Sequence, residues 1–240
     1  MANVIHLQNV SKSFKKKHVI KPTNLVVEES KIFGLLGPSG CGKTTLIKMI
    51  VGMLKADKGD ITVLNKKVPE ASLLKEIGYM AQSDALYTEL TGEQNLAFFA
   101  KLFGFTNSER KERIQYAANI VQLTQDLKVP VSSYSGGMKR RLSLAIALIQ
   151  NPKILILDEP TVGIDPLLKK SIWQELERLK DEEQKTIVIT THVMDEAEKC
   201  DRLAMMRDGS IIASGTPKEL KTQYQAQNFD DVFLKIGGVQ

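Results

Sequence analysis

The sequence of 240 residues contains no apolar run that approaches the ~18 residues needed to cross a membrane. It has only two cysteines, Cys41 and Cys200, and their unrelated surroundings argue against a structural disulfide. The first residues lead straight into a strand-like segment, without a charged and then apolar signal region. Repeats, low-complexity tracts and long linkers are also missing. These features predict a cytoplasmic protein whose membrane role, if it has one, comes through a partner.

The excess of basic over acidic residues in the chain is small. The chain has 33 basic and 28 acidic residues, which gives a net charge of +5. The densest basic clusters are Lys15–Lys17 and Lys139–Arg141. We interpret both as solvated faces, with a nucleic-acid or lipid surface as the alternative. A hydrophobic content of 42% is ordinary for a globular protein, and the length suits one large or two small domains.

The strongest motif is Gly37–Thr44, which fits the phosphate-binding pattern G-x-x-x-x-G-K-[ST]. A strand-like run, Ile32–Leu36, precedes it and a helical pattern, Thr45–Val51, follows, which is the context that the motif requires. Glycines let such a loop point its N–H groups at phosphate oxygens, and the helix N-terminus adds its dipole. We expect Lys43 to reach the β- and γ-phosphates of ATP, and the Thr44 hydroxyl to hold Mg²⁺. The predicted ATP-binding residues here are Gly37, Pro38, Ser39, Gly40, Cys41, Gly42, Lys43, Thr44 and Thr45.

Strand and helix patterns predict an α/β fold. Thr91 and Gln94 form a capping box that opens a helical region extending to about Ile149, and Asp165 caps a helix that begins at Pro166. We expect a P-loop NTPase core with a parallel sheet, an N-terminal antiparallel β subdomain and an inserted α-helical subdomain. The expected boundaries are 1–83 and 151–220 for the core, 84–150 for the helical subdomain and 221–240 for a short C-terminal tail.

The all-apolar run Ile154–Leu157 predicts a buried parallel strand, and it ends in two acids. Carboxylates at the tip of such a strand are unfavourable without a partner. Asp158 is therefore the expected Mg²⁺ ligand beside Thr44, and Glu159 is the expected general base that polarises the attacking water. A solvated turn is the alternative.

A second candidate anion site, Ser135-Gly136-Gly137, opens the helix that begins at Gly136, since Ser135 is an N-cap residue and the glycines leave N–H groups accessible. Read alone, this segment would be an ordinary helix cap. In a chain that also has a phosphate loop, this segment resembles the signature Leu-Ser-Gly-Gly-Gln of the ATP-binding cassette (ABC) family. Tyr134 and Met138 differ from the signature at its two ends. The resemblance covers residues 4–220 in family order, and the segments Tyr134–Arg141 and Thr161–Pro166 look most like the multidrug and daunorubicin-resistance-type exporter branch.

The resemblance implies further site residues. Gln82 would contact Mg²⁺ and the attacking water, His192 would contact the γ-phosphate, Asp165 would belong to the D-loop, and Phe14 would stack on adenine. Read alone, these would be a surface glutamine, a structural histidine, a helix cap and an edge residue packed on Lys15–Lys17. Cys41 replaces a commoner small residue, and its position beside Lys43 and a helix N-terminus predicts a lowered thiol pKa and an oxidation-sensitive ATPase.

The resemblance also implies how such a chain works. Ser135, Gly136 and Gly137 would cap the γ-phosphate bound by a second chain, so that two cassettes, identical or paired, close on two ATP molecules. An integral-membrane permease is the expected partner, at the inner face of the cell membrane, and nucleic acid is not expected. The permease would dock at Tyr87–Leu90, with packing inside the helical subdomain as the alternative. Export of drugs or other hydrophobic compounds is the expected role, and a soluble ABC ATPase acting on nucleic acid or ribosomes is the alternative.

Overall fold

The computed structural model describes residues 2–236 of the chain. Two compact units make up the fold: one joins the residues up to Leu73 to those from Thr186 onward, and the other is Leu74–Lys185. The predicted boundary of the helical subdomain at 84–150 differs from this division and stays a prediction. None of the described helices has both the length and the apolar character of a membrane span.

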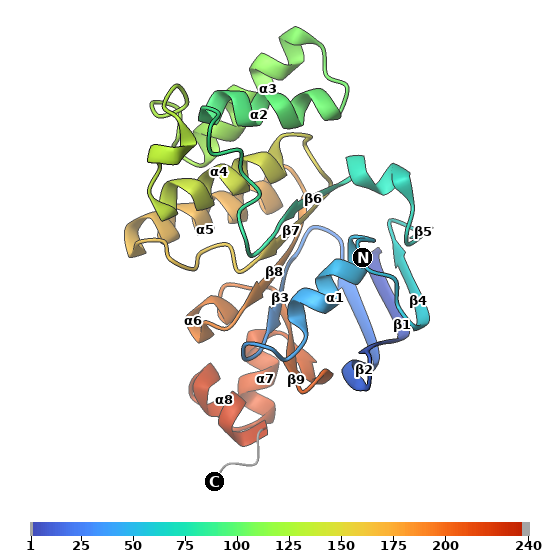
Figure 1. The fold of residues 1–240 in the computed structure, drawn as a ribbon. Helices are drawn as coiled ribbons and strands as arrows, with labels where there is room; N and C mark the ends of the chain where they lie inside the picture. The colour runs from blue at the N-terminus through green and yellow to red at the C-terminus, as the bar shows by residue number, and fades with distance from the viewer. Residues whose placement is uncertain (1, 237–240) are drawn as a thin grey trace. The chain divides into compact units, whose positions relative to one another are not determined.

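An antiparallel sheet opens the first unit. Its strands are paired in the order β2-β1-β4-β5, and buried Thr23, Leu25 and Val27 alternate with exposed residues along β2, as expected for a sheet with one covered face. Helix α1 packs against β2 and β4 (Figure 1). The predicted N-terminal antiparallel subdomain is confirmed. The elements are β1 (Asn3–Phe14), β2 (Lys17–Glu28), α1 (Lys43–Ile50), β4 (Lys58–Val63) and β5 (Lys66–Lys67), and a 3₁₀ turn η1 (Ala71–Lys75) includes the residue at which the second unit begins.

A second, mainly parallel sheet completes the first unit. Strand β3 pairs in parallel with β8 on one side and with β9 on the other, and β10 pairs with β9 in the antiparallel sense. Every residue of β3 and β8 is buried, as expected for parallel strands that are covered on both faces. The elements are β3 (Ile32–Leu36), β8 (Thr186–Thr191), α6 (Met194–Ala197), β9 (Arg202–Arg207), β10 (Ser210–Gly215), α7 (Pro217–Gln223) and α8 (Phe229–Ile236).

Helix α8 lies in the stretch for which the sequence predicted only a tail. Its Phe229 and Val232 side chains are fully buried, and the amide of Asp231 donates to Asn228 Oδ1. The helix contacts α6 and α7. The tail therefore contributes to the core of the first unit.

The second unit combines one parallel strand pair with the helices. Strands β6 and β7 pair with Ile77 opposite Ile154 and Met80 opposite Leu157. Helices α2, α3 and α4 pack on one another, and the green-to-yellow ribbon of Figure 1 shows them grouped. The predicted capping box at Thr91 and the predicted Asp165 cap are both confirmed. The elements are β6 (Ile77–Met80), α2 (Gly92–Leu102), α3 (Asn107–Ile120), a 3₁₀ turn η2 (Val131–Ser133), α4 (Gly136–Leu148), β7 (Ile154–Asp158) and α5 (Pro166–Asp181).

Gly78 in β6 allows α4 to approach the strand closely. A Cβ at this position would lie 2.1 Å from the carbonyl oxygen of Ala147. We expect Gly78→Ala to lower the free energy of unfolding by about 1–3 kcal/mol, because backbone must move to make room. Urea unfolding followed by circular dichroism measures the change. Gly136→Ala is the control, since no atom lies within 4 Å of its added Cβ; equal losses in both variants would contradict the prediction.

Candidate functional site

The phosphate loop occupies the turn between β3 and α1. Gly40 and Gly42 have φ angles of 77° and 113°, in the left-handed region that glycine tolerates best. Gly37 needs glycine for a different reason, because a Cβ there would lie 2.3 Å from the carbonyl oxygen of Met206. Pro38, Ser39 and Gly40 are exposed, so that the loop presents its backbone on the surface. Helix α1 begins at Lys43, two residues earlier than predicted.

The side chain of Lys43 crosses the inside of this loop. Its ammonium group donates to the carbonyl oxygens of Gly37, at 2.7 Å, and Pro38, at 3.1 Å, and the residue is only 5% exposed. Thr44 and Thr45 follow in the first turn of α1 and are partly exposed. The arrangement places a positive charge, a helix N-terminus and two hydroxyls around one exposed turn, which is the chemistry of a phosphate site.

His192 emerges at the same edge of the sheet as the phosphate loop. Leu36, the last residue of β3, pairs with Thr191, the last residue of β8, and the amide of Gly37 donates to the Thr191 carbonyl at 3.2 Å. His192 follows directly and is exposed. The first unit therefore brings together the loop and the histidine, although Gly37 and His192 are 155 positions apart in the sequence.

Phe14 ends β1, and its ring is 47% exposed. The ammonium group of Lys12 lies 5.6 Å from the ring centroid. An exposed aromatic face is what stacking on a base requires, and the role of Phe14 in ATP binding stays a prediction.

The predicted lowering of the Cys41 pKa is wrong. Cys41 is 6% exposed, and burial raises its pKa above the ordinary value of a thiol. The positive charge of Lys43 acts in the opposite sense but has the smaller effect. Since the thiolate is the reactive form, the structure removes the physical reason for expecting an oxidation-sensitive cysteine.

In the second unit, parallel pairing of β6 and β7 directs Gln82 and the acidic pair to one edge. The Gln82 amide Nε2 donates to Glu159 Oε2 at 3.1 Å. Asp158 is fully buried at the end of β7, and Glu159 is 7% exposed with a φ angle of 53°. Burial, with the negative charge of Asp158, raises the pKa of Tyr79 to about 12. Gln82, which the sequence indicated only through the family resemblance, is thus directly bonded to Glu159, which the strand pattern indicated.

A pocket of about 350 Å³ opens beside this pair. Sequence reasoning missed two of its residues, Asp84 and Arg140. The interpretation of Lys139–Arg141 as a solvated face is wrong for Arg140, which is 6% exposed. Its spacing from Leu144 and Ala147, at i+4 and i+7, could have placed it on a buried helix face. The pocket is lined by Gln82, Asp84, Gly136, Arg140, Glu159, Val162 and Gly163.

The predicted signature segment caps α4. Ser135 Oγ accepts a hydrogen bond from the amide of Met138 at 3.2 Å, and Ser135 and Gly136 are exposed. Tyr134, which departs from the family signature, is 4% exposed and donates its hydroxyl to the Asp126 carbonyl at 2.7 Å. The departure is therefore accommodated in the core and leaves the Ser-Gly-Gly segment on the surface.

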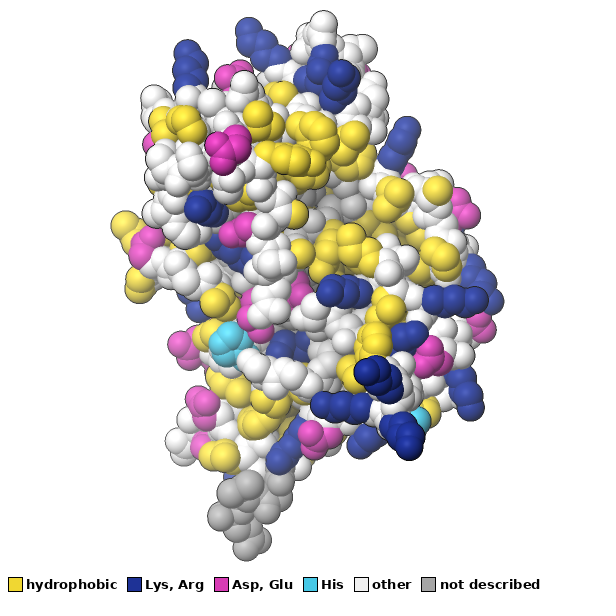
Figure 2. All heavy atoms as spheres, viewed as in Figure 1, with side chains coloured by type: hydrophobic (Ala, Val, Ile, Leu, Met, Phe, Trp, Pro, Cys, Tyr) yellow, Lys and Arg dark blue, Asp and Glu magenta, His cyan; other side chains and the backbone are white. Residues whose placement is uncertain are grey.

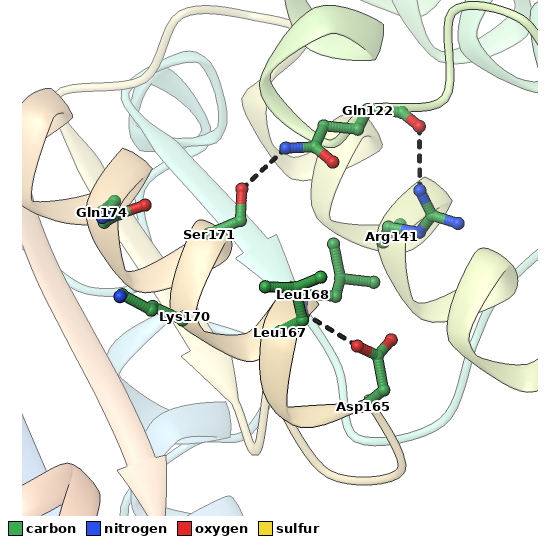
Figure 3. A pocket seen from close by; sticks show the side chains of 8 residues that line it. All are labelled: Gln122, Arg141, Asp165, Leu167, Leu168, Lys170, Ser171 and Gln174. Atoms are coloured by element: carbon green, nitrogen blue, oxygen red, sulfur yellow. Dashed lines mark hydrogen bonds between the residues drawn. The ribbon is translucent and has the colours of Figure 1, made fainter.

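Asp165 acts as the cap of α5, with Oδ1 accepting from the amide of Leu168 at 3.0 Å. It lines an open pocket of about 580 Å³ in which Gln122 donates to Ser171 Oγ at 2.7 Å (Figure 3). Figure 3 also shows Arg141 directed at the main-chain carbonyl of Gln122. The cap is a structural role, and the D-loop role stays a prediction.

The three predicted Mg²⁺ ligands are distributed over both units, with Thr44 in the first and Gln82 and Asp158 in the second. Hydroxyl, amide and carboxylate oxygens are donors that Mg²⁺ accepts. Within residues 2–236, no three His, Cys, Asp or Glu residues gather into a metal-binding group. The donor types of these three residues fit Mg²⁺, and their joint role as ligands stays a prediction.

Known proteins share this sequence and this fold. The ABC transporter family model matches residues 20–162. ABC transporter G family member 23 of Dictyostelium discoideum is 40% identical over 97% of this chain and 34% of its own length. Nod factor export ATP-binding protein I of Sinorhizobium fredii is 42% identical over 90% and 64%, and linearmycin resistance ATP-binding protein LnrL of Bacillus subtilis is 39% identical over 90% and 70%. The chain thus spans about one third of the length of the first of these proteins and about two thirds of the length of the second.

A solved structure agrees. A dimeric ATP-binding cassette in a post-hydrolysis state, bound to ADP and Pi, superposes with a TM-score of 0.83 at 27% identity, over 88% of this chain and 98% of that one. The predictions of the family, of the fold class and of an ATPase are confirmed. The chain belongs to the ABC transporter family, as one of its ATP-hydrolysing cassettes.

Proposed function

We propose that this chain is the ATP-binding and hydrolysing subunit of a transporter, and that it drives a separate integral-membrane permease in the export of drugs or other hydrophobic compounds. The observation that carries the hydrolytic part is the Gln82–Glu159 hydrogen bond at the pocket beside the end of β7. The names of two relatives, which concern Nod factor export and linearmycin resistance, support export. The permease would hold the chain at the inner face of the cell membrane.

The first unit supplies the binding half of this mechanism. Backbone N–H groups of Ser39–Thr44, the Lys43 ammonium and the α1 dipole bind the ATP phosphates, while Phe14 stacks on the base. Thr44, Gln82 and Asp158 would hold Mg²⁺, which neutralises phosphate charge. On binding, Lys43 exchanges its bonds to the Gly37 and Pro38 carbonyls for bonds to phosphate.

The second unit supplies the hydrolytic half. Glu159 accepts a proton from a water held by Gln82, and the water oxygen forms a bond to the γ-phosphorus. The bond from the γ-phosphorus to the bridging oxygen breaks, and ADP and inorganic phosphate leave. His192 donates to the γ-phosphate as charge develops on it. The exposed Ser135 and Gly136 at the start of α4 bind the γ-phosphate of a second cassette, and Asp165 joins the same interface.

An exposed aromatic cluster supports the docking of a permease. Tyr87 and Phe98 are 49% and 39% exposed, and their rings meet edge to face with centroids 4.9 Å apart. Leu102, at 66% exposed, extends the apolar surface along α2, and Figure 2 shows hydrophobic side chains gathered over this helix. The partner would present an apolar helix or loop to this cluster.

Glu159→Gln is expected to lower kcat by about 10²–10⁴-fold, because the general base is lost while the ATP-binding groups remain. Single-turnover ATPase assays and size-exclusion chromatography with ATP measure the rate and the expected stalled dimer. Glu177→Gln, at an exposed position on α5, is the matched control. Hydrolysis at the wild-type rate by Glu159→Gln would exclude Glu159 as the base.

Lys43→Ala is expected to weaken ATP binding itself, by about 10-fold or more, since charge-assisted hydrogen bonds to phosphate are lost. Equilibrium titration with a fluorescent ATP analogue measures the dissociation constant. Lys48→Ala removes an exposed charge from the same helix and should leave the dissociation constant for the ATP analogue unchanged. Equal affinities of the Lys43→Ala variant and the wild type would exclude this phosphate site.

Tyr87→Glu is expected to abolish co-purification of a membrane protein, because a charge would enter the apolar contact. Tagged Glu159→Gln protein, with and without Tyr87→Glu, is purified from detergent-solubilised membranes with ATP, and the eluted proteins are identified by mass spectrometry. Leu234→Glu introduces the same charge at a half-exposed position of α8 and should retain the partner. Ribosomal proteins or nucleic acid in place of a membrane protein would overturn the transporter proposal.

A further inference from the structure

Arg140 links two main-chain segments that meet at the Gln82–Glu159 pair. Its Nη1 donates to the carbonyl oxygens of Ala81, at 2.8 Å, and Gln82, at 2.9 Å. Its Nη2 donates to the carbonyl oxygens of Asp158 and of Glu159, the latter at 2.6 Å. One buried guanidinium therefore holds the chain just beyond β6 and at the end of β7 at a fixed separation.

The distance between these two segments decides whether the Gln82 and Glu159 side chains can contact the same water. Gln82 and Glu159 are bonded through their side chains at 3.1 Å and through Arg140 at their carbonyl oxygens. Glu159 also adopts the left-handed region, with φ at 53°, which a residue with a Cβ adopts only when its surroundings hold it there. The bond from Arg140 to the Glu159 carbonyl is one such restraint.

The guanidinium is itself held in place. Asp84 Oδ1 lies 3.5 Å from Nη1 and accepts a hydrogen bond from Ser143 Oγ at 2.7 Å. Arg140 and Ser143 are both residues of α4, the helix that Ser135 caps. Ser143 thus holds Asp84, and Asp84 holds the Arg140 guanidinium. These contacts fix the bridging group relative to α4, the helix that begins with the signature segment.

We propose that Arg140 is a positioning residue for ATP hydrolysis, which aligns Gln82 with Glu159 and couples that pair to the position of the signature helix. The proposal rests on the proposed function of the pair. Arg140 touches neither ATP nor water in this mechanism, and it acts through main-chain carbonyls. Displacement of α4 would change the alignment of the pair, so that hydrolysis responds to the contacts made by Ser135 and Gly136.

Lysine cannot replace arginine in this role. The planar guanidinium presents N–H groups in a fixed fork that reaches four carbonyl oxygens, whereas an ammonium has three donors at one point. Arg140→Lys keeps the buried positive charge but releases one of the two segments. Because misplacement of a reacting group by about 1 Å lowers rates by up to about 10²-fold, we expect kcat to fall about 10- to 100-fold. The KM for ATP should change less than about threefold, since the phosphate loop is untouched.

Arg141→Lys is the matched control. Arg141 is the neighbouring residue of the same helix, and its guanidinium donates to the carbonyl oxygens of Val121 and Gln122 instead. Steady-state kinetics of the wild type, Arg140→Lys and Arg141→Lys, with thermal unfolding of each, separates positioning from stability. The proposal predicts a selective loss of kcat in Arg140→Lys at an unfolding temperature similar to that of Arg141→Lys.

A double-mutant cycle provides the readout that a purely structural role would not change. In a Gln82→Ala background the pair is already broken, so Arg140→Lys should lower kcat by less than about threefold further. Full additivity of the two losses, or a wild-type kcat in Arg140→Lys, would overturn the proposal. If wild type hydrolyses ATP and Glu159→Gln does not, such a result rejects the role of Arg140 alone. If Glu159→Gln is fully active, the proposed function itself fails.

A milder substitution covers the case in which Arg140→Lys does not fold. Asp84→Asn removes the carboxylate charge that holds Nη1 and keeps the size of the side chain. Loss of this contact should lower kcat by about three- to tenfold with an unchanged KM. An unchanged kcat in Asp84→Asn would then overturn the proposal.

Discussion

Parallel pairing of β3 with β8, and of β6 with β7, places most of the residues that are expected to bind or hydrolyse ATP at the carboxyl ends of these strands. Neighbouring parallel strands finish at the same edge, so residues remote in the sequence meet there without long connecting loops. The phosphate loop and His192 follow the first pair, and Gln82 and Glu159 follow the second. Within each unit, the register of a strand pair therefore sets the spacing of the groups that act.

Unusual backbone conformations occur where these strands end. Gly40 and Gly42 adopt positive φ angles at the phosphate loop, and Glu159 does so beyond β7. For the glycines this conformation costs little, whereas for Glu159 the cost is of order 1 kcal/mol or more. The carbonyl and the carboxylate of Glu159 are both hydrogen bonded within the same unit. The surrounding polar contacts thus hold a conformation that local sequence preferences disfavour.

The sequence predicted much of this arrangement because the informative patterns are local. A glycine-rich loop, a capping box at Thr91 and an all-apolar strand before Asp158 are each read within a few residues, and the Asp165 cap indicates the start of the helix at Pro166. The role of Arg140 could not be read in this way, because its partners are main-chain carbonyls some 19 and 58 residues away. Charge alone placed it on the surface, and only the packing of α4 shows it to be buried.

The misjudged pKa of Cys41 has a similar cause. Proximity to Lys43 is visible in the sequence, but the burial that outweighs it comes from the folded unit, in which the amide of distant Gly209 donates to the Cys41 carbonyl at 3.0 Å. Helix α8 was missed because its apolar residues become meaningful only against α6 and α7. Short-range charge effects and short amphipathic segments are the parts of a sequence whose meaning is most often set by tertiary context.

Tyr134 illustrates how the first residue of a family signature can change while Ser135 and Gly136 stay exposed. Its hydroxyl lies so near the start of α2 that a Cβ on Gly92 would come within 2.4 Å of it. A side chain at the position of Gly92 is therefore excluded for steric reasons as long as Tyr134 is present. Among related cassettes, a side chain larger than hydrogen at the position of Gly92 should accompany a smaller residue at the position of Tyr134. The residue that begins the signature thus limits what the first turn of another helix can carry.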